Sequence, residues 1–355
     1  MGNINTSVDL RREGDIAVVT ADNPPVNALK HQVRAGLAEA LHQTRDDPAI
    51  KAVVIACAGR TFFAGADITE FGKPPRAPGL GEVIAAIEAM PKPVIAALHG
   101  TALGGGFELA LACHFRVAVA GARVGLPEVK LGLLPGAGGT QRLPRLIGPE
   151  KALKMIVTGD PIEASEALAD GIVDEIVDGD LTTGTIAFAR SVAAENRPLR
   201  LVRDREDKLS AEGFADAAEA LTRRLRGREA PAACVEAVRN AIVLPFEEGL
   251  KREGELFRKL VTGDQSKAQR HVFFAEREEY QREQSRARSR AARLSAPAQW
   301  AAASRCVLLM PGSRSRLSRL GATCCKRAST GSPPTTARRW RAAGSALTRW
   351  SAASL

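Results

Sequence analysis

The sequence predicts an α/β fold, from two observations. Short apolar runs at residues 52–57 and 94–98 are bounded by polar residues or glycine, as expected of buried strands. The segments at residues 28–44 and 80–90 instead repeat their apolar residues at helical spacing, and three glycines at 104–106 open an apolar helix at 106–113. Strands that alternate with helices along a chain are typical of an α/β architecture.

In chain order, the predicted elements alternate through the first half of the sequence. They are a strand at 15–20, a helix at 28–44, a strand at 52–57, a helix at 80–90, a strand at 94–98, a helix at 106–113 and a strand at 116–120. Helices at 150–157 and 164–169 and a strand at 171–177 follow. From about residue 185 to 280 the chain is charged with a helical period, and only Leu201-Val202 suggests a strand.

The charge of the chain is concentrated at one end. The net charge is +10, yet the residues after Glu283 contain no Asp or Glu and many Arg, so the rest of the chain is mildly acidic. The tail has no usable periodicity, which predicts disorder. We therefore divide the chain into an α/β domain at 1–190, a helical extension at 191–284 and a disordered tail at 285–355.

Composition also bears on the compartment. No apolar stretch approaches the roughly 20 residues that span a bilayer, so we expect no membrane span. The N-terminus has no secretory pattern, and the six cysteines have no framework or metal-like spacing. These features favour a cytoplasmic protein with reduced thiols.

Three glycine-rich segments could carry chemistry, at residues 62–67, 99–108 and 134–140. Glycine lets the backbone approach a ligand and leaves N–H groups free to point at it. Two such turns side by side could form an oxyanion hole, although each could also be a structural turn. The third segment lacks the spacing of G-x-G-x-x-G, so we reject a dinucleotide site there.

Two carboxylates stand among apolar residues. Glu108 interrupts the apolar helix at 106–113, and Glu128 lies in an equally apolar segment. Paired carboxylates in a dry site are suited to general acid–base catalysis, whereas a single buried glutamate is often paired structurally. His99 and His114 have no nucleophile or metal-spaced partner, so we interpret them as structural and expect no metal site.

Together these segments resemble the crotonase (enoyl-CoA hydratase/isomerase) superfamily over roughly residues 5–280. The resemblance rests on four motifs in order, at residues 23–28, 61–67, 100–108 and 124–144. Within the superfamily the chain is most similar to the N-terminal half of bifunctional hydratase/3-hydroxyacyl-CoA dehydrogenases of fatty-acid β-oxidation. Motifs at 112–116, 125–128, 244–253 and 271–277 are typical of that branch.

The resemblance implies a fold, a substrate class and residue roles. The fold would be a crotonase-like spiral of ββα units, and the substrate an acyl-CoA thioester. Backbone N–H groups of Ala66 and Gly105 would hold the thioester oxygen, Glu108 would activate water and Glu128 would exchange the α-proton. The adenine of CoA would lie against main chain at Ala64, Ala66, Asp67 and Ile68.

The implied reaction is hydration of 2-enoyl-CoA to 3-hydroxyacyl-CoA, with enoyl-CoA isomerisation as a second activity at the same site. An isomerase or hydrolase of the same superfamily is the alternative, since this scaffold serves many reactions. An adaptor that binds nucleic acid or anionic membrane through its basic tail is an alternative of another class, but the tail has no groove-reading motif. We therefore expect no nucleic-acid partner, and the sequence does not indicate an oligomeric state.

The resemblance ends where a dinucleotide-binding domain would follow. Reading Ser295 to Arg319 in a frame shifted by one base produces a strand, a G-x-G-x-x-G turn, a helix and a terminal acid. We interpret the tail as a frameshifted remnant of the dehydrogenase, with a native basic tail as the alternative. No NAD site and no other cofactor are therefore expected, and a peroxisomal location is the alternative to a cytoplasmic one.

Overall fold

The computed structural model describes residues 2–279, 282, 283 and 286. Residues 2–275 form one compact unit, and a second unit begins at Glu276. The domain boundaries expected at residues 190 and 284 stay predictions. Apart from Arg286, the tail at 285–355 and the frameshift proposed for it lie outside the described residues.

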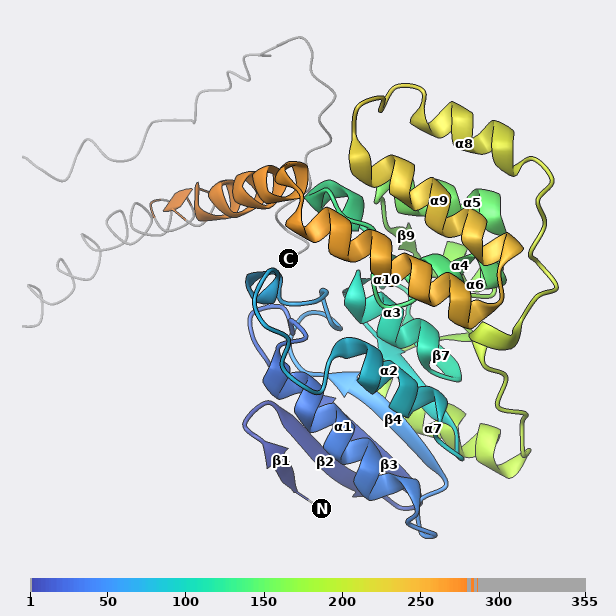
Figure 1. The fold of residues 1–355 in the computed structure, drawn as a ribbon. Helices are drawn as coiled ribbons and strands as arrows, with labels where there is room; N and C mark the ends of the chain where they lie inside the picture. Colours follow the sequence, from blue (N-terminus) through green and yellow to red (C-terminus); the bar gives the residue numbers. More distant parts are fainter. Residues whose placement is uncertain (1, 280–281, 284–285, 287–355) are drawn as a thin grey trace, which may run out of the picture. The chain divides into compact units, whose positions relative to one another are not determined.

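The first unit is built on a mixed sheet of seven strands (Figure 1). Its strands, in spatial order, are β1 (Asn3–Asn5), β2 (Val8–Glu13), β3 (Ile16–Ala21), β4 (Ala52–Cys57), β5 (Val94–Leu98), β7 (Phe115–Val119) and β10 (Glu175–Val177). The first three pair antiparallel, and every pairing from β3 onward is parallel. A second sheet of three short strands contains β6 (Thr101–Leu103), β8 (Arg123–Gly125) and β9 (Ile162–Glu163).

Helices cover both faces of the large sheet and stack beyond it. They are α1 (His31–Arg45), α2 (Leu80–Glu88), α3 (Gly105–Ala112), α4 (Gly139–Ile147), α5 (Pro149–Thr158), α6 (Ala164–Ala169), α7 (Leu181–Ala194), α8 (Phe214–Thr222), α9 (Glu229–Val243) and α10 (Phe246–Thr262). Short 3-10 turns lie at Ile68–Glu70, Glu128–Leu131 and Val202–Asp204. Residues 264–279 are also helical.

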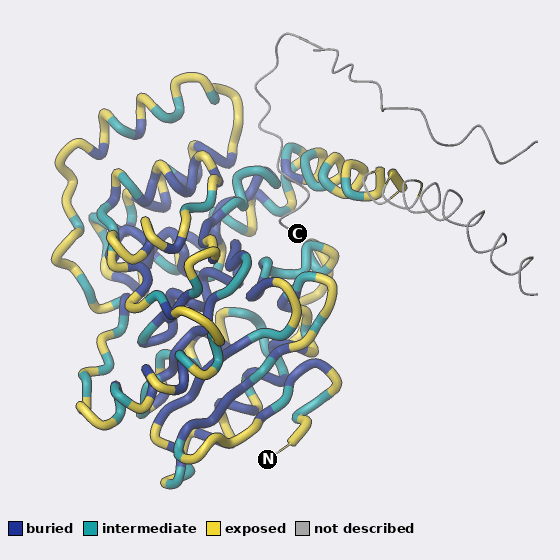
Figure 2. The backbone as a smooth tube through the Cα atoms, turned by 180° about the vertical axis from the view of Figure 1, so that it is seen from behind, coloured by how far each residue is buried: buried dark blue, intermediate teal, exposed yellow. Residues whose placement is uncertain are grey.

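The strands are apolar on both faces because both faces are covered. Val53 and Ile55 of β4 join the main core with α1, whereas Val54 points to a second cluster that contains Ile186 and Phe188 of α7. This alternation explains the continuous apolar run of the strand, which is typical of parallel sheets. Figure 2 shows the buried segments running along the strands.

The helical extension packs against the α/β part of the same unit. Helix α9 contacts α4, α5 and α10, and α10 also contacts α4. In Figure 1, α9 and α10 lie side by side over α4. Segments far apart in sequence therefore meet around the N-terminal end of α4.

Most predicted elements are confirmed, with shifts at their ends. The strand expected over residues 171–177 is confined to β10 because residues 170–172 form a turn at the end of α6. Leu201-Val202 is a cap and 3-10 turn rather than a strand. Sequence analysis missed β2, whose Val8 and Leu10 point inward while charged residues alternate outward.

Candidate active site

Helix α3 places Glu108 in its first turn. Gly104 precedes the helix with a φ of 53° and would bring a side chain to within 2.9 Å of Glu128 Oε1, so both the backbone conformation and the available space require glycine. All eight residues of α3 are buried. Glu108 is only 3% exposed, so its carboxylate is held inside the protein.

The carboxylate of Glu108 is held by a glycine-rich loop. Its Oε1 accepts hydrogen bonds from the N–H groups of Ala137 at 2.8 Å and Gly139 at 2.9 Å. Burial raises the pKa of Glu108, and these two N–H groups oppose that rise. Gly139 also begins α4, where the helix dipole favours a negative charge. Burial remains the largest effect, so the pKa of Glu108 stays above its usual value, but the two N–H donors and the start of α4 limit the rise.

Glu128 has a different environment. It begins the 3-10 turn that follows β8, and within the described residues its buried Oε2 has no hydrogen-bond partner. Burial raises the pKa of Glu128 well above its usual value, and the negative charge of Glu108 raises it further. A backbone hydrogen bond to the Glu128 carboxylate opposes this rise, but burial outweighs it and favours the neutral form. Glu128 is therefore suited to donate a proton.

The structure brings the two turns of the expected oxyanion hole together. The N–H of Leu103 donates to the carbonyl of Phe63 at 3.1 Å, which joins the two glycine-rich segments. A Cβ built on Gly105 would lie 3.3 Å from the backbone nitrogen of Ala66. Because Gly105 is the first residue of α3, its N–H has no acceptor within the helix. Two backbone donors thus lie side by side.

The residues expected to line the CoA adenine form the stretch between Ala64 and the 3-10 turn. The N–H of Ala64 donates to the carbonyl of Val26 at 3.2 Å, and Ala66 bridges to Leu29. Asp67 caps the turn that begins at Ile68, since its Oδ1 accepts from the N–H of Thr69 at 2.9 Å. The side chain of Asp67 therefore has a local structural role, and the CoA contact stays a prediction about the backbone.

Sequence analysis missed a third carboxylate, Glu253 of α10. Its side chain is 0% exposed. It accepts hydrogen bonds from the N–H of Gly138 at 2.6 Å and from the N–H of Thr140 at 3.0 Å, and also from the Thr140 hydroxyl. In the sequence, Glu253 stands at the end of the motif at 244–253, and a charged helix gives no signal that one of its glutamates is buried.

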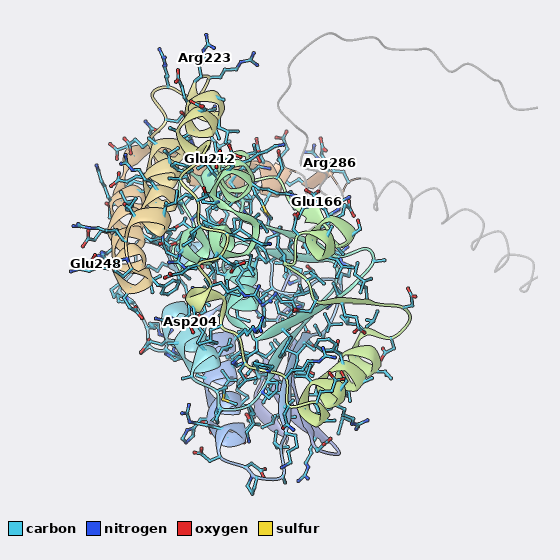
Figure 3. The ribbon with its side chains drawn as sticks, turned by 90° about the vertical axis from the view of Figure 1, so that its right-hand side faces the viewer. Glu166, Asp204, Glu212, Arg223, Glu248 and Arg286 are labelled. Carbon is cyan, nitrogen blue, oxygen red and sulfur yellow. The ribbon has the colours of Figure 1, made fainter. Side chains whose placement is uncertain are left out.

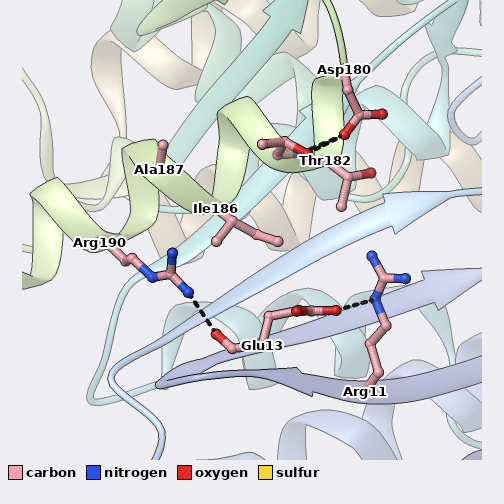
Figure 4. A pocket seen from close by; sticks show the side chains of 8 residues that line it. Arg11, Glu13, Asp180, Thr182, Ile186, Ala187 and Arg190 are labelled. Carbon is pink, nitrogen blue, oxygen red and sulfur yellow. Dashed lines mark hydrogen bonds and ion pairs between the residues drawn. The ribbon is translucent and has the colours of Figure 1, made fainter.

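Other features of the described residues lie away from these carboxylates. A hollow of about 530 Å³ is lined by Arg11, Glu13, Asp180, Arg190 and neighbouring residues of β2 and α7 (Figure 4). His114 is buried, and its Nδ1 accepts from the N–H of Val94 at 3.0 Å, in line with a structural role. In the part of the chain that the structure describes, no group of His, Cys, Asp or Glu is arranged to hold a metal ion, and no helix could cross a membrane.

Comparisons with known proteins agree with this geometry. Residues 11–205 match the family model for enoyl-CoA hydratase/isomerase. The peroxisomal bifunctional enzyme of Danio rerio is 46% identical over 267 residues, which cover 74% of this chain and 37% of the relative. The peroxisomal bifunctional enzyme of Homo sapiens is 43% identical over 277 residues, 75% of this chain and 38% of the relative. The chain thus spans less than half the length of these relatives.

Solved structures show the same fold. Enoyl-CoA hydratase subunit I from Geobacillus kaustophilus superposes with a TM-score of 0.52 at 32% identity, and the match covers 77% of this chain and 97% of that one. Enoyl-CoA hydratase from Bacillus anthracis has a TM-score of 0.50 at 29% identity, covering 73% and 92%. These findings confirm the crotonase-like α/β fold and the resemblance to bifunctional enzymes. The chain belongs to the enoyl-CoA hydratase/isomerase family.

Proposed function

We propose that this protein hydrates 2-enoyl-CoA thioesters to 3-hydroxyacyl-CoA. The observation that carries the proposal is the contrast between the hydrogen bonds of the two carboxyls. Glu108 has two N–H donors, whereas Glu128 Oε2 is buried without a partner among the described residues. Burial raises the pKa of both carboxyls, but it raises that of Glu128 well above its usual value, and carboxyls whose pKa values are pushed apart are suited to act as base and acid.

The reaction follows from this assignment. Ionised Glu108 takes a proton from water while the water oxygen bonds to the β-carbon of the substrate. The π electrons move toward the thioester oxygen, where the N–H groups of Ala66 and Gly105 stabilise the negative charge. Neutral Glu128 then gives its proton to the α-carbon. Both glutamates exchange protons with solvent before the next turnover.

A second activity uses only part of this machinery. Moving a double bond from the 3-position to the 2-position needs proton removal and return along the acyl chain, but no water. Glu128, to which we assign the exchange of the α-proton, can support this reaction while the same N–H groups hold the enolate. We therefore propose enoyl-CoA isomerisation as a side activity. We also propose that both reactions belong to fatty-acid β-oxidation.

The names of the relatives bear on location. The Danio and human proteins are called peroxisomal, which favours the peroxisomal alternative over the cytoplasmic location predicted from the sequence. Imaging of the tagged full chain in a eukaryotic host would test this. A diffuse signal would favour the cytoplasmic prediction.

The full chain should be assayed with crotonyl-CoA and with a longer 2-enoyl-CoA. Hydration is followed as loss of the absorbance of the conjugated thioester and as formation of 3-hydroxyacyl-CoA. The matched background is the protein with both Glu108→Gln and Glu128→Gln. A wild-type rate no higher than that background on both substrates contradicts the proposal.

A further inference from the structure

Two glutamates of helix α10 differ in their exposure. Glu248 points away from the helix (Figure 3), whereas Glu253 is fully buried. Glu253 receives three hydrogen bonds and within the described residues has no Lys or Arg ion-pair partner. Burying a carboxylate without a counter-charge costs free energy, which the three hydrogen bonds to Glu253 offset.

The donors to Glu253 alternate with the donors to Glu108 along one loop. The N–H groups of Ala137 and Gly139 point to Glu108, and those of Gly138 and Thr140 point to Glu253. The 137–140 loop therefore donates hydrogen bonds to two carboxylates, Glu108 of α3 and Glu253 of α10. If the hydrogen bonds to Glu253 are lost, we expect the N–H groups that donate to Glu108 to lose their fixed orientation.

The hydrogen bonds around Glu253 all have a defined donor and acceptor. Gln141 Nε2 donates to Thr140 Oγ1 at 2.9 Å and to the carbonyl of Ala237 at 2.9 Å, and the Thr140 hydroxyl donates onward to Glu253. Every group that faces the Glu253 carboxylate is thus a donor. An amide at this position would turn its NH₂ toward some of these donors.

We infer that Glu253 is a positioning residue, which holds the 137–140 loop so that its N–H groups fix the orientation of Glu108. The predicted effect on kcat rests on the proposed function, whereas the predicted effect on the 137–140 loop does not. Glu253 does not need to touch substrate. It makes the helical extension part of the active-site framework.

The test compares Glu253→Gln with Glu248→Gln, the same chemical change at an exposed site of the same helix. Glu253→Gln should lower kcat for hydration by about 10- to 100-fold, the range that small misplacements of a catalytic group produce, with little change in KM. Isomerisation, which relies on Glu128, should be lowered much less. Glu248→Gln should match wild type in all three quantities.

Amide hydrogen exchange gives a readout that does not depend on activity. Glu253→Gln should speed exchange not only at Gly138 and Thr140 but also at Ala137 and Gly139, the two donors to Glu108. Thr140→Val removes the hydroxyl that donates to Glu253 and accepts from Gln141 Nε2, and keeps the two N–H donors to Glu253. It should produce a smaller effect in the same direction and replaces Glu253→Gln as the test if that variant fails to fold.

The outcomes separate the two ideas. Unchanged exchange at Ala137 and Gly139 in a folded variant overturns the positioning role, whether or not the protein is a hydratase. Equal losses of hydration and isomerisation also overturn it, because they indicate a general structural defect. A wild-type protein without hydration, but with the expected exchange pattern, overturns the proposed function and leaves the positioning role supported.

Discussion

Replacing Glu108 by Gln tests the assignment of the base most directly. The amide oxygen of Gln can still accept the N–H groups of Ala137 and Gly139, which now donate at 2.8 and 2.9 Å, so the loop keeps its anchor. The amide cannot take a proton from water. Loss of a general base lowers rates by about 10²–10⁴-fold, and at about 1.4 kcal/mol per tenfold this is roughly 3–5.5 kcal/mol of activation free energy.

The assay should measure hydration and isomerisation on the same preparations. Glu108→Gln should lower kcat for hydration by about 10²–10⁴-fold with KM nearly unchanged, and should retain most of the isomerisation activity. Glu128→Gln should lose both activities, because both need proton exchange along the acyl chain. Hydration by Glu108→Gln within tenfold of wild type would show that another group activates water, and equal loss of both activities would refute the division of roles.

Three further predictions concern the oxyanion hole, stability and the tail. Gly105→Val should abolish turnover, since even a Cβ would lie 2.8 Å from Leu80 Cδ2 and 3.3 Å from the Ala66 nitrogen, and retained turnover in a folded variant would argue against this turn. Because folding raises the pKa of Glu128, its contribution to stability is full below the pKa of the unfolded chain and is lost as pH rises toward the folded pKa, by up to about 1.4 kcal/mol per pH unit. Urea unfolding between pH 5 and 8 should therefore show a shallower decline in Glu128→Gln, and identical slopes would contradict this. The chain should form no NADH from 3-hydroxyacyl-CoA and NAD, because we find no dinucleotide fingerprint in its printed reading frame, and NADH formation would defeat the frameshift interpretation.

The sequence predicted the parts of the fold that local patterns determine. Strands β4 and β5 are continuous apolar runs, and α3 is apolar throughout except for Glu108, so each could be recognised from its own residues. Strands β6 and β8 have only three residues each, too few for any period to emerge. Their position depends on pairing with each other, which only the folded chain shows.

Helix α4 could not have been predicted from propensity. It begins with glycine and contains Pro144, both poor helix formers. Tertiary contacts stabilise its start instead, because the N–H of Gly139 donates to Glu108 and the N–H of Thr140 donates to Glu253. These N–H groups would otherwise lack partners at a helix N-terminus. The same contacts that form the helix therefore place the proposed catalytic base.

The pKa of Glu253 shows how tightly the helical extension is coupled to the site. Burial raises the pKa of Glu253 to about 8, and the negative charge of Glu108 contributes to that rise, while the three hydrogen bonds oppose it. The negative charge of Glu108 therefore acts on Glu253 across one loop, and the N–H groups of that loop oppose the rise in the pKa of both carboxyls. The family model matches residues 11–205, which include Glu108 and Glu128 but not Glu253. A chain ending at residue 205 would leave the N–H groups of Gly138 and Thr140 without their carboxylate, so we expect the matched segment alone to hold the proposed base less firmly.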